Sequence, residues 1–120
     1  MSLLALVMLT VGCFGGGNQD SKLHGKWTGQ GGVTIEFQPG NKIRMSTPGE
    51  IDREGLYWTN FKKKPYWIDI DLQNMDKNIQ TVFGFDSEGR LQIETTQPGQ
   101  PRPKALTPSA VFFTKTGQSK

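Results

Sequence analysis

The sequence has little of the chemistry that marks an enzyme or a metalloprotein. Its 120 residues include one cysteine, Cys13, and one histidine, His24. A single cysteine cannot form a disulfide within the chain. With one histidine, we expect neither a catalytic triad nor a histidine metal cluster. The residue counts do not exclude a catalytic serine–lysine pair, but no motif in the sequence positions a serine and a lysine for catalysis. We therefore expect no enzyme, with no catalytic residue, no metal site and no cofactor.

Concentrated charge is also missing. The formal net charge is +3 and the basic residues are dispersed along the chain. A nucleic-acid-binding domain gathers such residues on one face, so we expect no nucleic acid as partner. Asp69 and Asp71 alternate onto one strand face, but no calcium-loop motif follows them. We interpret them as part of a hydrated surface, with a calcium or acid/base pair as the alternative.

No apolar run is long enough for a transmembrane helix. The longest covers residues 3–11 and leads to Gly12 and Cys13. It is about half of the roughly 20 residues that a span needs, and it suits the apolar core of a signal peptide. Residues 10–13 resemble the lipobox of bacterial lipoproteins, although Thr10 stands where leucine is preferred and no basic residue precedes the run. The alternative is an N-terminal strand or helix with a buried thiol.

The lipobox resemblance implies an exported protein that is anchored to a membrane. Residues 1–12 would be the signal peptide, and Cys13 would carry the lipid anchor. The location would be the periplasmic face of the cell envelope, or the thylakoid lumen in a cyanobacterium. Residues 13–22 begin with a run of glycines and continue with polar residues, which predicts a flexible tether. A domain over residues 23–116 and a disordered tail over 117–120 complete the predicted organisation.

The rest of the chain predicts strand after strand. Residues 33–38 alternate apolar and polar side chains, a tight-turn sequence follows at 39–41, and the alternation resumes over 42–46. Such period-two alternation around a turn is typical of a β-hairpin. No window of eleven or more residues has a convincing helical stripe. The predicted strands cover residues 26–29, 33–38, 42–46, 52–59, 66–72, 78–85, 90–95 and 110–115.

Short connections between consecutive strands favour an antiparallel meander, and about eight such strands can close into a barrel that has no free edge. The predicted fold is therefore all-β, an antiparallel up-and-down barrel. The opening of this domain also resembles the Gly-x-Trp motif of lipocalin-like barrels, with Gly25 and Trp27 at the matching positions. In that family the tryptophan packs across the barrel base, which implies the same role for Trp27.

Further short segments follow the order found in small lipocalin-like lipoproteins of bacteria, cyanobacteria among them. They lie at residues 55–57, 65–69, 89–91, 102–103 and 111–113, so the resemblance covers about residues 23–115. It implies a lipocalin-like fold and no particular activity, because that family has no common function.

The bulky apolar residues of the alternating strands predict the inner face of the barrel. An eight-stranded barrel is either filled by side chains or just wide enough for one small ligand. We expect side chains to fill most of the interior, with a shallow ligand pocket at one mouth as the alternative. The expected inner residues are Val33, Ile35, Phe37, Ile43, Met45, Tyr57, Ile68, Ile70, Ile79, Phe83, Leu91, Ile93, Val111 and Phe113.

Two connections are candidates for contact with a partner. Three lysines flanked by aromatic residues form a turn that is either simply solvated or in contact with an anionic membrane or an acidic protein. Residues 97–104 are rich in proline and are either a strap that lets Ala105 and Leu106 cover an open end or a presented recognition segment. The candidate contact residues of the turn are Lys62, Lys63, Lys64, Tyr66 and Trp67.

Together these features predict a membrane-tethered lipoprotein that acts as a non-catalytic interaction or accessory module, with a protein partner. The alternative function is binding or carriage of a small apolar ligand in the barrel mouth.

Overall fold

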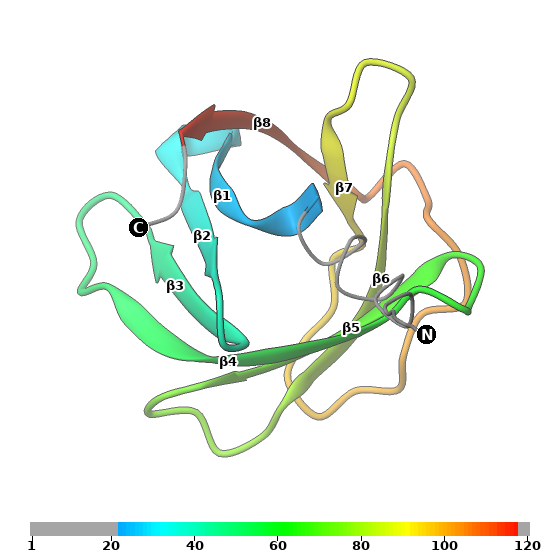
Figure 1. Cartoon of the computed structure of the whole chain (residues 1–120). Coiled ribbons are helices and arrows are strands. Elements are labelled where there is room, and N and C mark those ends of the chain that lie inside the picture. The colour runs from blue at the N-terminus through cyan, green and yellow to red at the C-terminus, as the bar shows by residue number, and fades with distance from the viewer. Residues whose placement is uncertain (1–21, 118–120) are drawn as a thin grey trace, which may run out of the picture.

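The computed structural model describes residues 22–117, and these residues form a closed barrel of antiparallel strands (Figure 1). Each strand pairs with the next in the chain, and the last pairs with the first, so the predicted all-β, up-and-down fold with eight strands is confirmed. A short 3-10 turn, η2 (Gln30–Gly32), follows the first strand. The strands are β1 (Gly25–Gly29), β2 (Thr34–Gln38), β3 (Lys42–Ser46), β4 (Arg53–Asn60), β5 (Tyr66–Leu72), β6 (Ile79–Phe85), β7 (Leu91–Ile93) and β8 (Val111–Gly117).

The predicted signal peptide, Cys13 and almost all of the predicted tether lie outside the described residues, as do residues 118–120 of the predicted tail. Lys22, which we assigned to the tether, begins a short helical turn with Leu23. Gly117, which we assigned to the tail, is the last residue of β8.

The ladder between β1 and β8 closes the barrel. Thr28 pairs with Thr114 and Lys26 with Gly117, with an irregularity in register between Lys26 and Trp27. Gly25, the residue before this ladder begins, has a φ of 131°, and a Cβ there would lie 2.7 Å from the Gly117 carbonyl oxygen. Only glycine combines this backbone conformation with so close an approach. Steric constraints therefore explain why the first position of the Gly-x-Trp opening is a glycine.

Period-two alternation places the predicted inner residues inside the barrel. Ile35, Phe37, Ile43 and Ile68 are all less than 3% exposed, and the other predicted inner residues belong to this core or pack against it. Burial of this apolar surface is the main term that favours folding. The core also contains residues that the alternation did not identify, namely Leu23, Trp27, Leu72, Phe61, Tyr66, Met75 and Phe85.

The two ends of the barrel differ. At the plugged end, defined by the start of β1, the turns 39–41, 61–65 and 86–90 and the end of β8, the Trp27 indole N–H donates to the Leu23 carbonyl at 2.8 Å. Trp27 is 2% exposed and its ring lies 6.1 Å from that of Phe85. Phe61 and Phe83 meet edge to face beside them. Apolar rings thus fill this end of the interior.

The opposite end, the mouth end, carries the turns 30–33, 47–52 and 73–78 and both ends of the long connection 94–110. We expected this connection to cover an open end, and that prediction is wrong. It runs along the outer wall beside β5 and β6, as the orange segment in Figure 1 shows. The Gly99 amide donates to the Asn78 carbonyl, and Leu106 packs over Gly84, which has no side chain to obstruct it. On the same strand as Gly84, the side chain of Val82 also points outward, yet it is only 1% exposed, so this part of the outer wall is covered.

The buried ring of Trp27 makes a direct prediction about stability. Trp27→Ala should lower the free energy of unfolding by about 3–5 kcal/mol, because truncation leaves a cavity at the plugged end. Urea denaturation followed by circular dichroism measures this loss. Trp58→Ala is the control, since Trp58 is 45% exposed and should cost far less. Equal losses for the two variants would contradict the role of Trp27 as the plug.

Candidate functional site

The lysine turn and the long connection, which are far apart in sequence, meet in one groove on the outer wall. The turn between β4 and β5 forms one side, and the 97–104 segment, here called the strap, forms the other. The groove has a volume of about 390 Å³ and no carboxylate lines it. The lining residues are Lys63, Lys64, Pro65, Trp67, Arg102, Pro103 and Lys104.

Trp67 is the floor of this basic groove. Its ring lies 4.3 Å from the Arg102 guanidinium carbon and 4.7 Å from the Lys63 ammonium nitrogen. Cations at this distance over an indole are attracted by the negative face of the ring. Trp67 therefore joins the strap to the lysine turn, and its ring is already in contact with cations of this chain.

Arg102 holds the strap on the barrel. Its guanidinium pairs with the Asp69 carboxylate at 2.6 Å and donates to the Thr81 carbonyl at 2.9 Å. The Arg102 side chain is only 15% exposed. A partly buried, charge-assisted contact of this kind is stronger than an exposed ion pair. Asp69, which we interpreted as part of a hydrated face, is thus a partner of Arg102, and Asp71 stays exposed.

The returning end of the long connection is held by a second carboxylate. Glu94 is 6% exposed, and its two oxygens accept hydrogen bonds from the Thr107 amide and hydroxyl, each at 2.6 Å. The Thr81 hydroxyl donates to the Glu94 carbonyl. This buried carboxylate is satisfied within the fold, so we assign it a structural role.

The structure separates the predicted contact residues into two groups. Lys62, Lys63 and Lys64 are exposed on the turn. Tyr66 points inward, with its ring 4.8 Å from that of Phe61 and 5.3 Å from that of Phe83. Tyr66 therefore supports the turn from inside the barrel.

Sequence reasoning missed Trp58 as a surface residue. Its outward direction follows from the alternation, because the neighbouring Tyr57 faces the core. Trp58 pairs with Asp69 while Trp67 pairs with Asn60, so the two tryptophans are diagonal neighbours on the outer face of β4 and β5. At 45% exposed, Trp58 is the large aromatic ring beside the groove that stays open to a partner.

The folded chain also separates charge between the two ends of the barrel, which the dispersed sequence pattern did not reveal. Basic residues dominate the plugged end, where Lys22, Lys26, Lys42, Lys62, Lys63, Lys64, Arg90 and Lys115 outnumber the acidic residues Glu36, Asp86 and Glu88. Exposed acidic residues outnumber basic ones at the mouth end, with Glu50, Asp52, Glu54, Asp71 and Asp76 against Arg53, Lys77 and Arg44, which pairs with Asp52 and Glu54.

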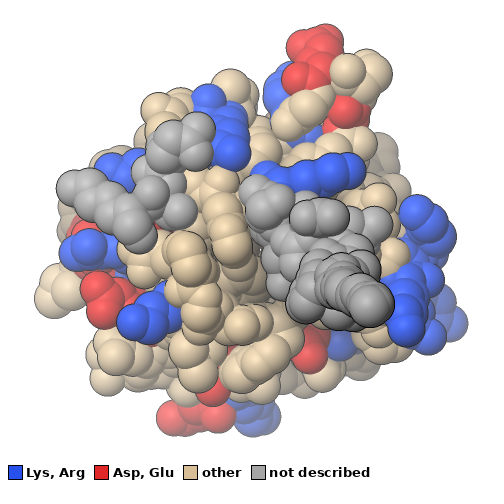
Figure 2. All heavy atoms as spheres, in the orientation of Figure 1, with Lys and Arg blue, Asp and Glu red and all other residues tan. Residues whose placement is uncertain are grey.

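Two acidic residues of the plugged end, Asp86 and Glu88, lie on a hairpin of their own. Asp86 pairs with Arg90 at 2.7 Å. Desolvation raises the pKa of the Asp86 carboxyl, but hydrogen bonds from Arg90 and from the Glu88 amide outweigh it and hold the pKa below its usual range. In Figures 1 and 2 this hairpin, β6–β7, projects at the top with red side chains at its tip, whereas blue side chains gather at the right, beside the turn between β4 and β5. The positive region is thus strongest at the lysine turn.

A second candidate site lies inside the mouth end. A cavity of about 150 Å³ opens there among inward side chains of several strands, and its polar lining residues are Thr81, Glu94, Thr95 and Thr96. Ligand pockets are usually about 300–1,000 Å³, so this cavity suits only a very small apolar molecule. Its apolar lining comprises Ile35, Met45, Ile70, Ile79, Ile93, Val111 and Phe113.

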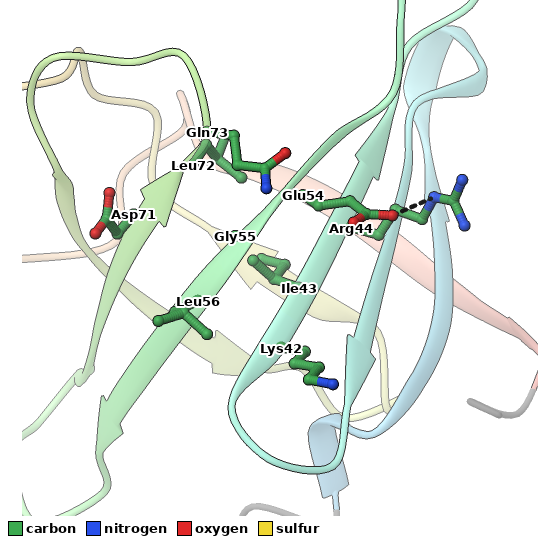
Figure 3. A pocket seen from close by; sticks show the side chains of 9 residues that line it. All are labelled: Lys42, Ile43, Arg44, Glu54, Gly55, Leu56, Asp71, Leu72 and Gln73. Carbon is green, nitrogen blue, oxygen red and sulfur yellow. Dashed lines mark ion pairs between the residues drawn. The ribbon is translucent and has the colours of Figure 1, made fainter.

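A third hollow, between β3, β4 and β5, is shown in Figure 3. In this hollow the backbone of β5 lies so close to Gly55 that a Cβ there would overlap the Asp71 carbonyl oxygen. Its charged residues are partly engaged with each other, since Arg44 lies 3.7 Å from Glu54 and 3.3 Å from Asp52. We assign no ligand chemistry to this hollow.

Comparisons with protein-family models, with curated proteins and with solved structures find no match. The lipocalin-like resemblance of the Gly25–Trp27 segment therefore stays a prediction. Within residues 22–117, no helix is long and apolar enough to cross a membrane. In the same part of the chain, no group of three His, Cys, Asp or Glu side chains is placed to hold a metal ion.

The contacts of Arg102 predict that it controls the groove. Arg102→Leu should release the strap from Trp67 and speed amide hydrogen exchange over residues 98–106. The free energy of unfolding should fall by about 1.5–3 kcal/mol, the range for hydrogen bonds to a charged group. Hydrogen exchange with mass spectrometry measures the first effect, and urea denaturation the second. Lys104→Gln is the matched control, because Lys104 lines the groove but lies on its exposed side. Unchanged exchange in Arg102→Leu would show that other contacts hold the strap.

Proposed function

We propose that this protein is a lipid-anchored, non-catalytic binding module of a bacterial cell envelope. The observation that carries the proposal is the basic groove, in which the lysine turn and the strap combine cationic and aromatic groups on a rigid wall. Sites that bind rather than react need exposed groups of this kind and no activated nucleophile or poised acid and base. The anchor would be Cys13, which the lipobox resemblance identifies.

The position of the groove agrees with an anchor at the N-terminus. The described chain begins at Lys22 and runs through Leu23 into β1 at the plugged end, the same end that carries the lysine turn. A lipid on Cys13 would be separated from Lys22 by a short glycine-containing segment. For a flexible chain of about nine residues, the average reach is on the order of 17 Å. An anchored barrel would therefore keep its plugged end close to the bilayer.

Replacing the anchor residue tests this proposal. Cys13→Ser should abolish incorporation of a labelled fatty acid when the gene is expressed in a bacterial host, because serine offers no thiol for acylation. The variant should accumulate with the apolar leader uncleaved, since lipoprotein signal peptidase acts after acylation. Gly12→Ala, which keeps a small residue before the cysteine, is the control and should remain labelled. Equal labelling of the wild type and Cys13→Ser would refute the anchor.

The cavity at the mouth end supports a second candidate function, the binding of a small apolar molecule. A cavity of about 150 Å³ with a mainly apolar lining has the size of cavities that hold benzene. This candidate differs from the first in that it requires no contact at the basic groove.

Benzene is the probe for this second candidate. Saturating benzene should raise the melting temperature of the wild-type protein, because a ligand that binds only the folded state stabilises it. Val111→Phe should reduce that rise by filling the cavity. If the wild type and Val111→Phe respond equally, the cavity is not the binding site, and the absence of any rise would leave it as a packing defect.

A further inference from the structure

We propose that one corner of the barrel, formed by Lys62, Lys63 and Lys64 with Trp58 on the adjoining wall, docks on a bilayer of anionic phospholipid. This inference deepens the proposed function, but it rests on groups of the barrel itself and not on the lipid anchor. It also assigns an orientation, with the plugged end toward the membrane and the mouth end away from it.

The three lysines of the turn form no ion pair with a carboxylate of residues 22–117. The ion pairs within residues 22–117 join Arg44, Arg90 and Arg102 to aspartate or glutamate, and none of them includes a lysine of the turn. The Lys63 and Lys64 ammonium groups lie over aromatic rings, at 4.7 Å from Trp67 and 4.8 Å from Tyr66. These contacts hold the ammonium groups at the surface without neutralising them. An anionic surface would therefore meet three unpaired positive charges.

Trp58 adds an exposed indole ring beside the lysines. Binding to an acidic protein patch through charge alone would not need this ring, whereas a bilayer surface offers it a favourable environment. Tryptophan favours the headgroup level of a bilayer, where the ring is half in an apolar environment. Trp58 is 45% exposed and Leu56, on the same outward face of β4, is 42% exposed. Both lie on the wall that leads to the lysine turn. Apolar side chains beside unpaired lysines match the layered chemistry of a bilayer surface.

The rest of the molecule favours this corner over other approaches. The acidic tip of the β6–β7 hairpin projects from a different side of the plugged end, so it does not stand between the lysines and a flat surface (Figure 1). The mouth end is dominated by acidic residues, and an anionic bilayer would repel it. The charge separation along the barrel therefore favours one orientation.

Vesicle flotation of the full-length chain carrying Cys13→Ser tests the proposal without a lipid anchor. The probes are vesicles of phosphatidylcholine alone and vesicles with about one third phosphatidylglycerol. We expect binding to the anionic vesicles to exceed binding to the neutral ones, and the excess to weaken between low and high salt because screening shortens the reach of the charges. The apolar leader is common to all variants, so the differences between variants report on the barrel.

Two further changes locate the contact. Replacing Lys62, Lys63 and Lys64 with glutamine should weaken the anionic excess by about 100-fold, or about fivefold per lysine. The matched control replaces the exposed residues Lys42, Arg53 and Lys77 with glutamine, which removes the same charge away from the lysine turn, two of the three at the mouth end. Trp58→Ala should weaken binding to anionic vesicles several-fold more than the Lys42, Arg53 and Lys77 control does. The tryptophan fluorescence of the wild type should shift to shorter wavelength when anionic vesicles are added. Melting temperatures should change little for the control and by a few degrees at most for the lysine variant, which loses the cation–π contacts of Lys63 and Lys64.

The outcomes are distinct. Equal losses for the lysine variant and its control would overturn the assignment to this corner and leave only net charge. No preference for anionic vesicles would overturn the membrane as partner and point to an acidic protein as the occupant of the groove. Neither result bears on acylation of Cys13, which the labelling experiment tests separately.

Discussion

The β1–β8 ladder is the constraint on which the rest of the structure depends. Without it, β1 and β8 would be exposed edges and the inner face would lie open to water. The ladder requires Gly25, because the backbone of Gly117 approaches too closely for a side chain. Trp27 lies two residues after Gly25 and turns inward, where its indole N–H donates to the Leu23 carbonyl. One glycine and one tryptophan thus close the barrel and plug one of its ends.

A closed barrel leaves its two ends and its outer wall for function. Filling one end with aromatic rings confines any interior site to the mouth end, where only a small cavity remains. The larger features are on the outside, where Arg102 fixes a long connection against the wall and beside the lysine turn. The same guanidinium satisfies backbone carbonyls, pairs with Asp69 and covers Trp67. A loop that would otherwise be a loose connection becomes one side of a rigid groove.

Local patterns in the sequence were sufficient to predict the strands and the fold. Residues 33–38 and 66–72 alternate because one side of each strand faces a core, and every strand inferred in this way is present. The contribution of Trp27 to the core was inferred from the Gly-x-Trp resemblance. The position of the strap was not predictable, because it depends on Arg102 meeting Asp69 across 33 residues of chain. The role assigned to Tyr66 was wrong, although alternation with Ile68 and Ile70 in the predicted strand 66–72 already places Tyr66 on the inner face.

The separation of charge was likewise hidden in the sequence. Basic and acidic residues alternate along the chain and sort into two ends only after the strands run up and down. The positive charge of the plugged end therefore does not come from the Lys62–Lys64 turn alone. Lys26, Lys42 and Lys115 contribute to it from other strands. In the proposed orientation, this asymmetry turns the basic end, where the chain enters the barrel, toward an anionic surface.

Orientation on a membrane is the central claim, and depth-dependent quenching measures it most directly. An environment-sensitive fluorophore would be placed by Ser87→Cys, Lys62→Cys or Glu50→Cys on the lipid-anchored protein bound to anionic vesicles, with Cys13 already consumed by its lipid. Quenchers carried by the phospholipid headgroups should quench the label at position 62 strongly, the label at 87 less, and the label at 50, at the mouth end, hardly at all. Equal quenching at positions 62 and 50 would contradict a barrel that rests on its lysine corner.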